Sequence, residues 1–129
     1  MNRKTHIIFS LILTVLGLLL IEIVAENKIP GTELLESIFT SYNISDYFLM
    51  FLFSIVGALV PDILDPTYTR HHRGFAHSKM ILLLLFVFFI ITLIYLIDDF
   101  NLGIWSLYFF LLGYMSHLLL DSLTPAGLT

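Results

Sequence analysis

The stretch MILLLLFVFFIITLIYLI at residues 80–97 decides the fold class, because its eighteen residues include no charged side chain. An apolar run of this length predicts a helix that crosses a bilayer. The whole chain of 129 residues shares this character, with 58% hydrophobic and 12% charged residues. Soluble domains are about 45–50% apolar and about 25% charged. We therefore expect one membrane-embedded domain over residues 1–129.

Three further apolar stretches predict membrane-crossing helices: Ile7–Val24, Tyr47–Val60 and Leu102–Leu120. The second of these reaches the length of a span only if its helix continues past Pro61 to about Leu64. Backbone groups that face lipid must be satisfied within their own segment, so all four spans should be helices. The sequence therefore predicts an all-α polytopic bundle of four transmembrane helices.

The N-terminal span has an alternative interpretation as a secretory signal peptide, since Arg3 and Lys4 precede it and Ala25 follows it. The apolar part of a signal peptide is about 7–15 residues long. The run of about 18 residues here is longer and suits a retained transmembrane helix.

The longest polar connection joins the first two spans. Pro30 and Gly31 interrupt the chain, Thr32 is a suitable helix N-cap, and apolar residues then recur at helical spacing up to Tyr42. We expect a short amphipathic helix at the membrane interface. A loop with some apolar residues is the alternative.

Lysine and arginine residues predict the orientation of the bundle, because cytoplasmic loops are enriched in them. With four spans, one side of the bilayer receives only Lys28, and the other receives the remaining five: Arg3, Lys4, Arg70, Arg73 and Lys79. Both termini should therefore be cytoplasmic, in the cell membrane. The net charge of −4 argues against nucleic acid as a partner.

The same cytoplasmic face receives every histidine of the chain and three aspartates: His6, Asp62, Asp65, His71, His72, His77, His117 and Asp121. His117 and Asp121 are four residues apart and share one helix face. An ionisable residue inside an apolar helix, such as His117, is energetically expensive and usually functional. A hydrogen bond to a neighbouring carbonyl is the alternative role for it. The chain has no cysteine, so a metal here would be bound by nitrogen and oxygen, which suits zinc, manganese or magnesium.

The number of candidate ligands favours more than one metal ion. A catalytic zinc site usually has three protein ligands and one open position, and this face offers more than three. Some could orient ligands instead of binding metal. Two or more zinc ions would use the surplus and would activate water against a phosphoryl or carbonyl group. Arg73 could hold a phosphate. For Arg70 we favour a role only in setting the orientation of the protein in the membrane.

Four sequence blocks resemble the YdjM-type inner-membrane proteins, a family described as LexA-regulated or membrane-bound metal-dependent hydrolases. The matching blocks, in order, are Thr5 to Ser10, Val60 to Ile63, His72-Arg73-Gly74-Phe75-Ala76-His77-Ser78, and Leu112 to His117 running on to Asp121 and Thr124-Pro125-Ala126-Gly127. They cover almost the whole chain. The combination of His-Arg-Gly-x-x-His-Ser with Gly-Tyr-x-x-His-x-x-x-Asp is specific.

The resemblance implies a helical membrane metallohydrolase, distantly similar to zinc-dependent phospholipase C and P1-type nucleases. It implies these metal ligands: His6, Asp62, His72, His77, His117 and Asp121. One departure is that the family often has Pro-Asp-Ile-Asp-His where this chain has Pro-Asp-Ile-Leu-Asp at residues 61–65. Asp65 therefore replaces a histidine ligand, or one ligand is missing. We count Asp65 as a candidate ligand and, with Arg73, as a candidate catalytic residue. His71 has no counterpart in the family pattern, and we expect it to be solvated.

We expect hydrolysis by metal-activated water at the cytoplasmic membrane surface. The substrate class that this location suggests is a phosphoester of a membrane lipid or lipid-like molecule, and a peptide or amide bond is the alternative. A non-enzymatic metal-binding scaffold is the competing function. A divalent metal transporter fits less well, because transporters place their ligands near the bilayer midplane.

Overall fold

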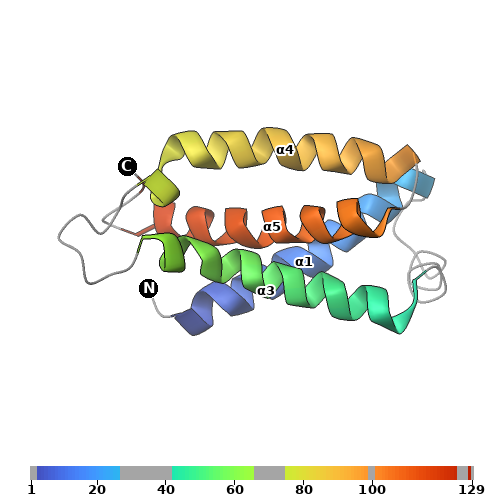
Figure 1. Ribbon diagram of the computed structural model, residues 1–129, viewed down its shortest axis with the longest axis horizontal. Helices are drawn as coiled ribbons and strands as arrows, with labels where there is room; N and C mark the ends of the chain where they lie inside the picture. Colours follow the sequence, from blue (N-terminus) through green and yellow to red (C-terminus); the bar gives the residue numbers. More distant parts are fainter. Residues whose placement is uncertain (1–2, 27–41, 66–74, 99–100, 125–127, 129) are drawn as a thin grey trace.

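The computed structural model describes residues 3–26, 42–65, 75–98, 101–124 and 128. Four long helices form a bundle (Figure 1): α1 (Arg3–Glu26), α3 (Ile44–Leu64), α4 (Lys79–Asp98) and α5 (Leu102–Ser122). A short 3-10 helix, η1 (Phe75–His77), precedes α4, and the described residues contain no strand. The predicted all-α bundle of four spans is confirmed. The predicted interfacial helix lies outside the described residues, within residues 27–41.

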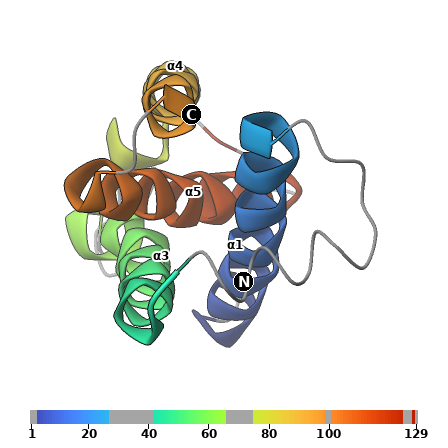
Figure 2. The ribbon, with the colours of Figure 1, turned by 90° about the vertical axis from the view of Figure 1, so that its right-hand side faces the viewer.

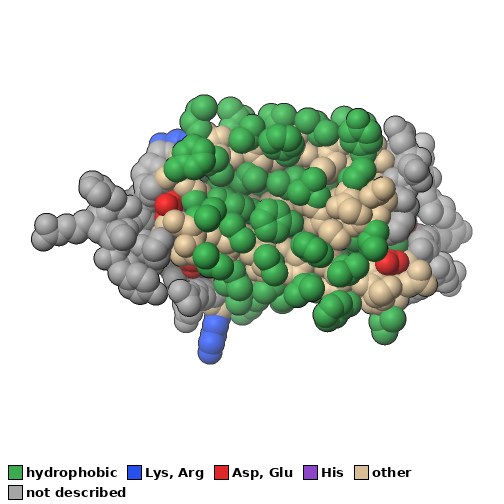
Figure 3. Space-filling view, viewed as in Figure 1, with side chains coloured by type: hydrophobic (Ala, Val, Ile, Leu, Met, Phe, Trp, Pro, Cys, Tyr) green, Lys and Arg blue, Asp and Glu red, His purple; other side chains and the backbone are tan. Residues whose placement is uncertain are grey.

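All four long helices are long and apolar enough to cross a membrane. On the face shown in Figure 3, hydrophobic side chains cover the middle of the molecule, whereas the visible Lys and Arg side chains lie at one end. That end also holds both chain termini (Figure 1). The second predicted span does continue past Pro61, which is buried in the last turn of α3. The Asp65 N–H donates to the Pro61 carbonyl at 2.9 Å, so the end of this helix is satisfied.

Helix α5 is the central element, and the other three long helices pack around it (Figure 2). In its membrane window 56% of the residues are buried, against 11% for α4. The most intimate contact is with α3, where two glycines let the backbones meet. An added Cβ at Gly57 would lie 2.1 Å from the Phe110 carbonyl oxygen, and one at Gly113 would lie 2.0 Å from the Ser54 carbonyl oxygen. Small residues permit such close approach in membrane bundles.

Buried hydroxyl groups connect α1 to α3. The Ser10 hydroxyl lies 2.6 Å from the Ser54 hydroxyl and also donates to the Ser54 carbonyl at 3.1 Å. The Thr14 hydroxyl contacts the same Ser54 hydroxyl and donates to the Ser10 carbonyl at 2.8 Å. Because Ser10 lies one turn after His6, this network fixes the face that α1 presents at its N-terminal end.

An aromatic cluster holds the opposite end of the bundle. Trp105, Tyr108 and Phe109 on α5 are fully buried, and the Trp105 indole N–H donates to the Asp46 carbonyl on α3 at 3.2 Å. One end of the molecule is therefore held by apolar packing. The other end contains buried histidines.

Candidate metal centre

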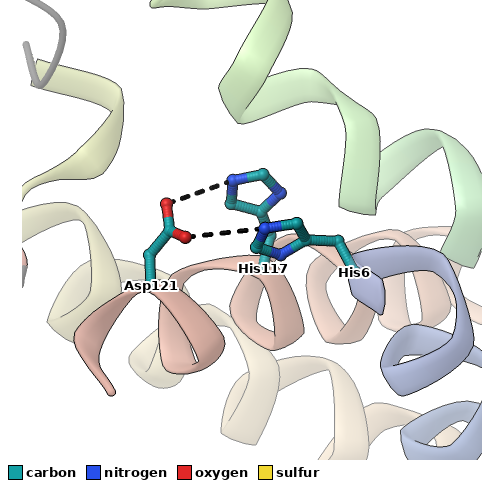
Figure 4. Close-up of side chains that lie close together, drawn as sticks. All are labelled: His6, His117 and Asp121. Carbon is teal, nitrogen blue, oxygen red and sulfur yellow. Dashed lines mark ion pairs between the residues drawn. The ribbon is translucent and has the colours of Figure 1, made fainter. Parts of the chain in front are cut away.

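Five of the predicted ligands converge at the end of the bundle that holds the termini. They come from the start of α1, the end of α3, the helix η1 and the end of α5: His6, Asp62, His77, His117 and Asp121. Figure 4 shows how His6, His117 and Asp121 face one another. Of the other predicted site residues, Asp65 is described and lies beside this group. His72 and Arg73 lie outside the described residues, as do Arg70 and His71.

The histidines are buried, and two aspartates line the more open side. His77 is 1% exposed and His117 is 0% exposed. The side chains of Asp62 and Asp65 are 19% and 18% exposed. A buried polar ring is costly unless its nitrogen atoms have partners. The contacts of each imidazole therefore determine whether its burial is compensated.

The ligand atoms of these residues lie close together. Asp121 is the common partner: its Oδ1 lies 3.5 Å from His6 Nε2, and its Oδ2 lies 3.5 Å from His77 Nε2 and 3.4 Å from His117 Nε2. His117 Nε2 also lies 3.3 Å from His77 Nε2 and 3.6 Å from Asp62 Oδ1. Ligands about 2.0–2.2 Å from a tetrahedral zinc ion stand roughly 3.3–3.6 Å from one another. The spacing of these atoms therefore fits a divalent metal ion.

The tautomers of two histidines also fit metal binding. His117 Nδ1 lies 2.7 Å from the Ala58 carbonyl oxygen, which can only accept a hydrogen bond, so Nδ1 carries the proton. Its Nε2 lone pair is thereby directed into the cluster. His77 Nδ1 lies 3.2 Å from Asp65 Oδ2, and its Nε2 faces the cluster in the same way. Metal-binding histidines usually donate their second ring N–H to a carbonyl or carboxylate.

His6 differs from the other two histidines of the cluster. Its ring stacks on that of His117, with centroids 3.9 Å apart and an angle of 14° between the planes. Its Nδ1 is buried and has no hydrogen-bond partner among the residues that the structure describes. Its Nε2 faces Asp121. His6 therefore depends on the cluster itself for any polar partner within the described part of the chain.

Two overlapping sets of three ligands can be recognised. One is His6, His117 and Asp121, and the other is Asp62, His77 and His117. They share His117, which has only one free ring nitrogen, so they are not two independent sites. Asp121 directs one oxygen toward His6 and the other toward His77 and His117. The carboxylate of Asp121 therefore joins the two sets into one connected centre.

The position of η1 depends on two residues, Tyr114 and Ser78, that belong to the quoted family blocks but were given no role from the sequence. The Tyr114 hydroxyl donates to the Ala76 carbonyl at 3.2 Å, and the Ser78 hydroxyl accepts from the Ile81 N–H at 3.2 Å. These bonds hold the residues on both sides of His77. Tyr114 and His117 are three residues apart and share one helix face. This spacing could have identified Tyr114 as a neighbour of the site from the sequence. No sequence signal identifies the carbonyl of Ala58 as a partner.

Asp65 lies beside the cluster and belongs to neither set of three ligands. Its carboxylate contacts the outer nitrogen of His77, on the side of the ring away from Asp121. Whether Asp65 binds metal stays a prediction. The structure shows that its contact with the centre runs through His77.

The fold and the site together define an α-helical membrane protein whose buried histidines and aspartates could hold a metal ion at one end of the bundle. The sequence model of the YdjM inner membrane protein family matches residues 1–129, and the chain belongs to that family. The predicted resemblance is thus confirmed. No curated protein and no solved structure shows significant similarity to the chain.

Proposed function

We propose that this protein is a membrane-bound metal-dependent hydrolase that cleaves a phosphoester in a lipid or lipid-like substrate. One observation carries the proposal above all. Five pairs of ligand atoms among His6, Asp62, His77, His117 and Asp121 lie 3.3–3.6 Å apart, at one end of a bundle that otherwise exposes apolar side chains. Ionisable groups within membrane helices are usually retained for function.

The donor set favours zinc among the divalent ions. Imidazole nitrogen suits zinc, whereas magnesium prefers a set made of oxygen atoms alone. Manganese and magnesium remain the alternatives, because two of the five ligands are carboxylates. When bound, such an ion acts as a Lewis acid and makes water a nucleophile near neutral pH.

The carboxylate of Asp121 supports a centre of two ions. His77 and His117 lie 3.5 Å and 3.4 Å from its Oδ2, and Asp62 lies 3.6 Å from His117 Nε2. Its Oδ1 faces His6 at 3.5 Å. We infer that His77 and His117 would hold one ion, that His6 would help to hold a second, and that the Asp121 carboxylate would contribute an oxygen to each. His72, for which the family resemblance implies a ligand role, would add a further ligand.

Substrate would approach from the side of Asp62 and Asp65, because these are the least buried acidic side chains of the centre. The cluster histidines are covered on their other sides by the bundle. Arg73 follows Asp65 by eight residues in the chain. We propose that its guanidinium holds a phosphate oxygen, since its planar fork matches phosphate geometry.

The surroundings of the centre support a substrate with an acyl chain. Large apolar side chains are exposed around this end of the bundle: Ile63, Leu64, Phe75, Met80 and Leu123. Exposed apolar side chains of this kind are suited to contact lipid where the headgroups meet the acyl chains. An apolar groove between α4 and α5 also begins here, with one cation among its lining residues: Lys79, Leu82, Leu83, Phe86, Met115 and Leu119. A lipid phosphate near Lys79 and an acyl chain along the groove would match this pattern.

A structural metal site is the second candidate function, and a specific observation favours it. Asp62, His77, His117 and Asp121 provide four ligand atoms, which could complete a tetrahedral zinc shell and leave no open position. The centre would then stabilise the bundle without catalysis. The two functions differ in whether His6 and a second ion are required.

The proposal is tested on the purified protein in lipid nanodiscs. We expect stoichiometric zinc or manganese by elemental analysis, together with hydrolysis of a fluorogenic phosphodiester lipid that ceases in Asp121→Asn. A protein that contains no divalent metal, and gains none on addition of zinc or manganese, contradicts the proposal. Bound metal with no hydrolysis of phosphoester, carboxylester or amide lipids would favour the structural site instead.

A further inference from the structure

We infer that Asp65 is a positioning residue that acts on the proposed metal centre through His77, and that it is not itself a metal ligand. The inference rests on the proposed function, since it assigns a role toward a metal. It concerns the residue at which this chain departs from the pattern of its family. The sequence left two possibilities open at this position: a replaced ligand or a missing one.

The backbone at the end of α3 separates Asp65 from Asp62. If both were helical, their spacing of three residues would place them on one face. Asp65 instead has φ −119° and ψ 74°, which lies outside the helical region, while its N–H still closes the helix on the Pro61 carbonyl. Asp62 thus remains with His117 at 3.6 Å, and Asp65 reaches His77 from outside the cluster.

The contact of Asp65 is with the ring nitrogen that the cluster does not use. His77 Nδ1 lies 3.2 Å from Asp65 Oδ2, whereas His77 Nε2 lies 3.3 Å from His117 Nε2 and 3.5 Å from Asp121 Oδ2. A carboxylate accepts a hydrogen bond and so keeps the proton on Nδ1. Nε2 then carries the lone pair that binding to a metal would require.

A charged partner also changes the strength of the ligand. His117 donates to a neutral carbonyl, that of Ala58, and His6 Nδ1 has no partner among the described residues. A carboxylate behind an imidazole fixes the ring and raises its basicity as a ligand, and loss of such a partner typically lowers metal affinity about 10–100-fold. Among the three described histidines of the centre, His77 is therefore the one whose outer nitrogen contacts a carboxylate.

A first experiment needs no metal and no activity. Metal-free protein labelled with ¹⁵N-histidine reports the tautomer of each imidazole, and His77 is assigned with the variant His77→Gln. We expect His77 to carry its proton on Nδ1, to lose this preference in Asp65→Ala and to keep it in Asp65→Asn, whose amide oxygen still accepts. Asp62→Asn is the matched control and should leave the His77 tautomer unchanged. A His77 proton on Nε2, or a tautomer unaffected by Asp65→Ala, overturns the inference.

A second experiment separates positioning from direct ligation. Zinc affinity is measured by competition with a chromophoric chelator for Asp65→Ala, His77→Ala and the double variant. If Asp65 acts through His77, its loss should weaken binding roughly 10–100-fold in the wild-type background and hardly at all once His77 is absent. Equal losses in both backgrounds would show that Asp65 binds the metal directly.

Cobalt substitution gives an independent signature. Asp65→Asn should leave the visible absorption of the cobalt protein nearly unchanged, because the ligands stay the same, whereas Asp62→Asn should shift it. A comparable shift in both variants contradicts the inference. A protein that binds no metal at all would refute the proposed function, and the tautomer measurement would still decide the role of Asp65.

Discussion

At the scale of single residues, His117 is the most constrained member of the centre. It is fully buried, its Nδ1 is committed to the Ala58 carbonyl, and its Nε2 belongs to both sets of ligands. His6 belongs to one set only. The two histidines stack on each other, yet their loss should have different consequences.

We therefore predict that His117→Ala removes all bound metal, whereas His6→Ala removes only the ion that His6 helps to hold. Elemental analysis of each purified variant gives the metal content per chain. Ser122→Ala, an exposed change on the last turn of α5, is the control and should keep the wild-type content. Identical metal content in the His6 and His117 variants would contradict a centre of two ions.

A second prediction at this scale compares two buried tyrosines with matched hydrogen bonds. Tyr114 donates to the Ala76 carbonyl and Tyr108 donates to the Gly17 carbonyl, both at 3.2 Å. Each Tyr→Phe change should lower stability by a similar amount, about 1 kcal/mol. Only Tyr114→Phe should weaken zinc binding, because Tyr114 holds η1 and hence His77. Equal zinc affinity in the two variants, measured by chelator competition, would show that the bond to Ala76 does not support the centre.

At the scale of secondary-structure elements, the contact of α3 with α5 sets the position of His117. Gly113 lies one turn before His117 and touches the α3 backbone at Ser54. Any side chain at position 113 must push the two helices apart, because its nearest neighbours are backbone atoms. A shift here would also separate His117 from Asp62 and from the Ala58 carbonyl.

Gly113→Ala should therefore lower stability by about 1–3 kcal/mol, the usual range for overpacking, and should weaken metal binding. Gly103→Ala is the matched control, since it lies near the start of α5 and its added Cβ would come within 3.2 Å of the Asn101 side-chain oxygen and would meet no backbone of α3. Thermal unfolding in detergent, with and without zinc, measures both effects. If Gly113→Ala unfolds like Gly103→Ala, the close contact does not control the site.

The helices and most of the centre were predictable from the sequence for simple physical reasons. The apolar run at residues 80–97 is long enough to cross a membrane and contains no charge, so it predicts α4. The spacing of four residues predicts that His117 and Asp121 lie together on one helix face. The role of Asp65 was not predictable, because it depends on the backbone leaving the helix at that residue. The partner of His117 is a backbone carbonyl, which carries no sequence signal.

At the scale of the whole molecule, the helix ends that carry the candidate metal ligands and both termini lie at one end of the bundle (Figure 1). The family is one of inner membrane proteins, and the distribution of Lys and Arg residues predicts that this end faces the cytoplasm. If so, the proposed hydrolase draws on metal and water from the cytoplasmic side.

The chain contains no cysteine, which makes this orientation directly testable. Single cysteines in place of exposed Ser122, near the centre, and exposed Asn101, at the opposite end, serve as probes. In intact cells, a membrane-impermeant thiol reagent should label Asn101→Cys and leave Ser122→Cys unlabelled until the membrane is opened. The reverse pattern would place the centre on the outer side.

The spread of the ligands along the chain also has a consequence for the timing of biosynthesis. The first ligand is residue 6 and the last described one is residue 121, a separation of 121 − 6 = 115 residues. During translation, Asp121 is therefore added only after the first three long helices and nearly all of α5 have been made. Because Asp121 joins the two sets of ligands, a nascent chain that still lacks the end of α5 would have no complete centre. The proposed hydrolysis could begin only after this helix had entered the membrane.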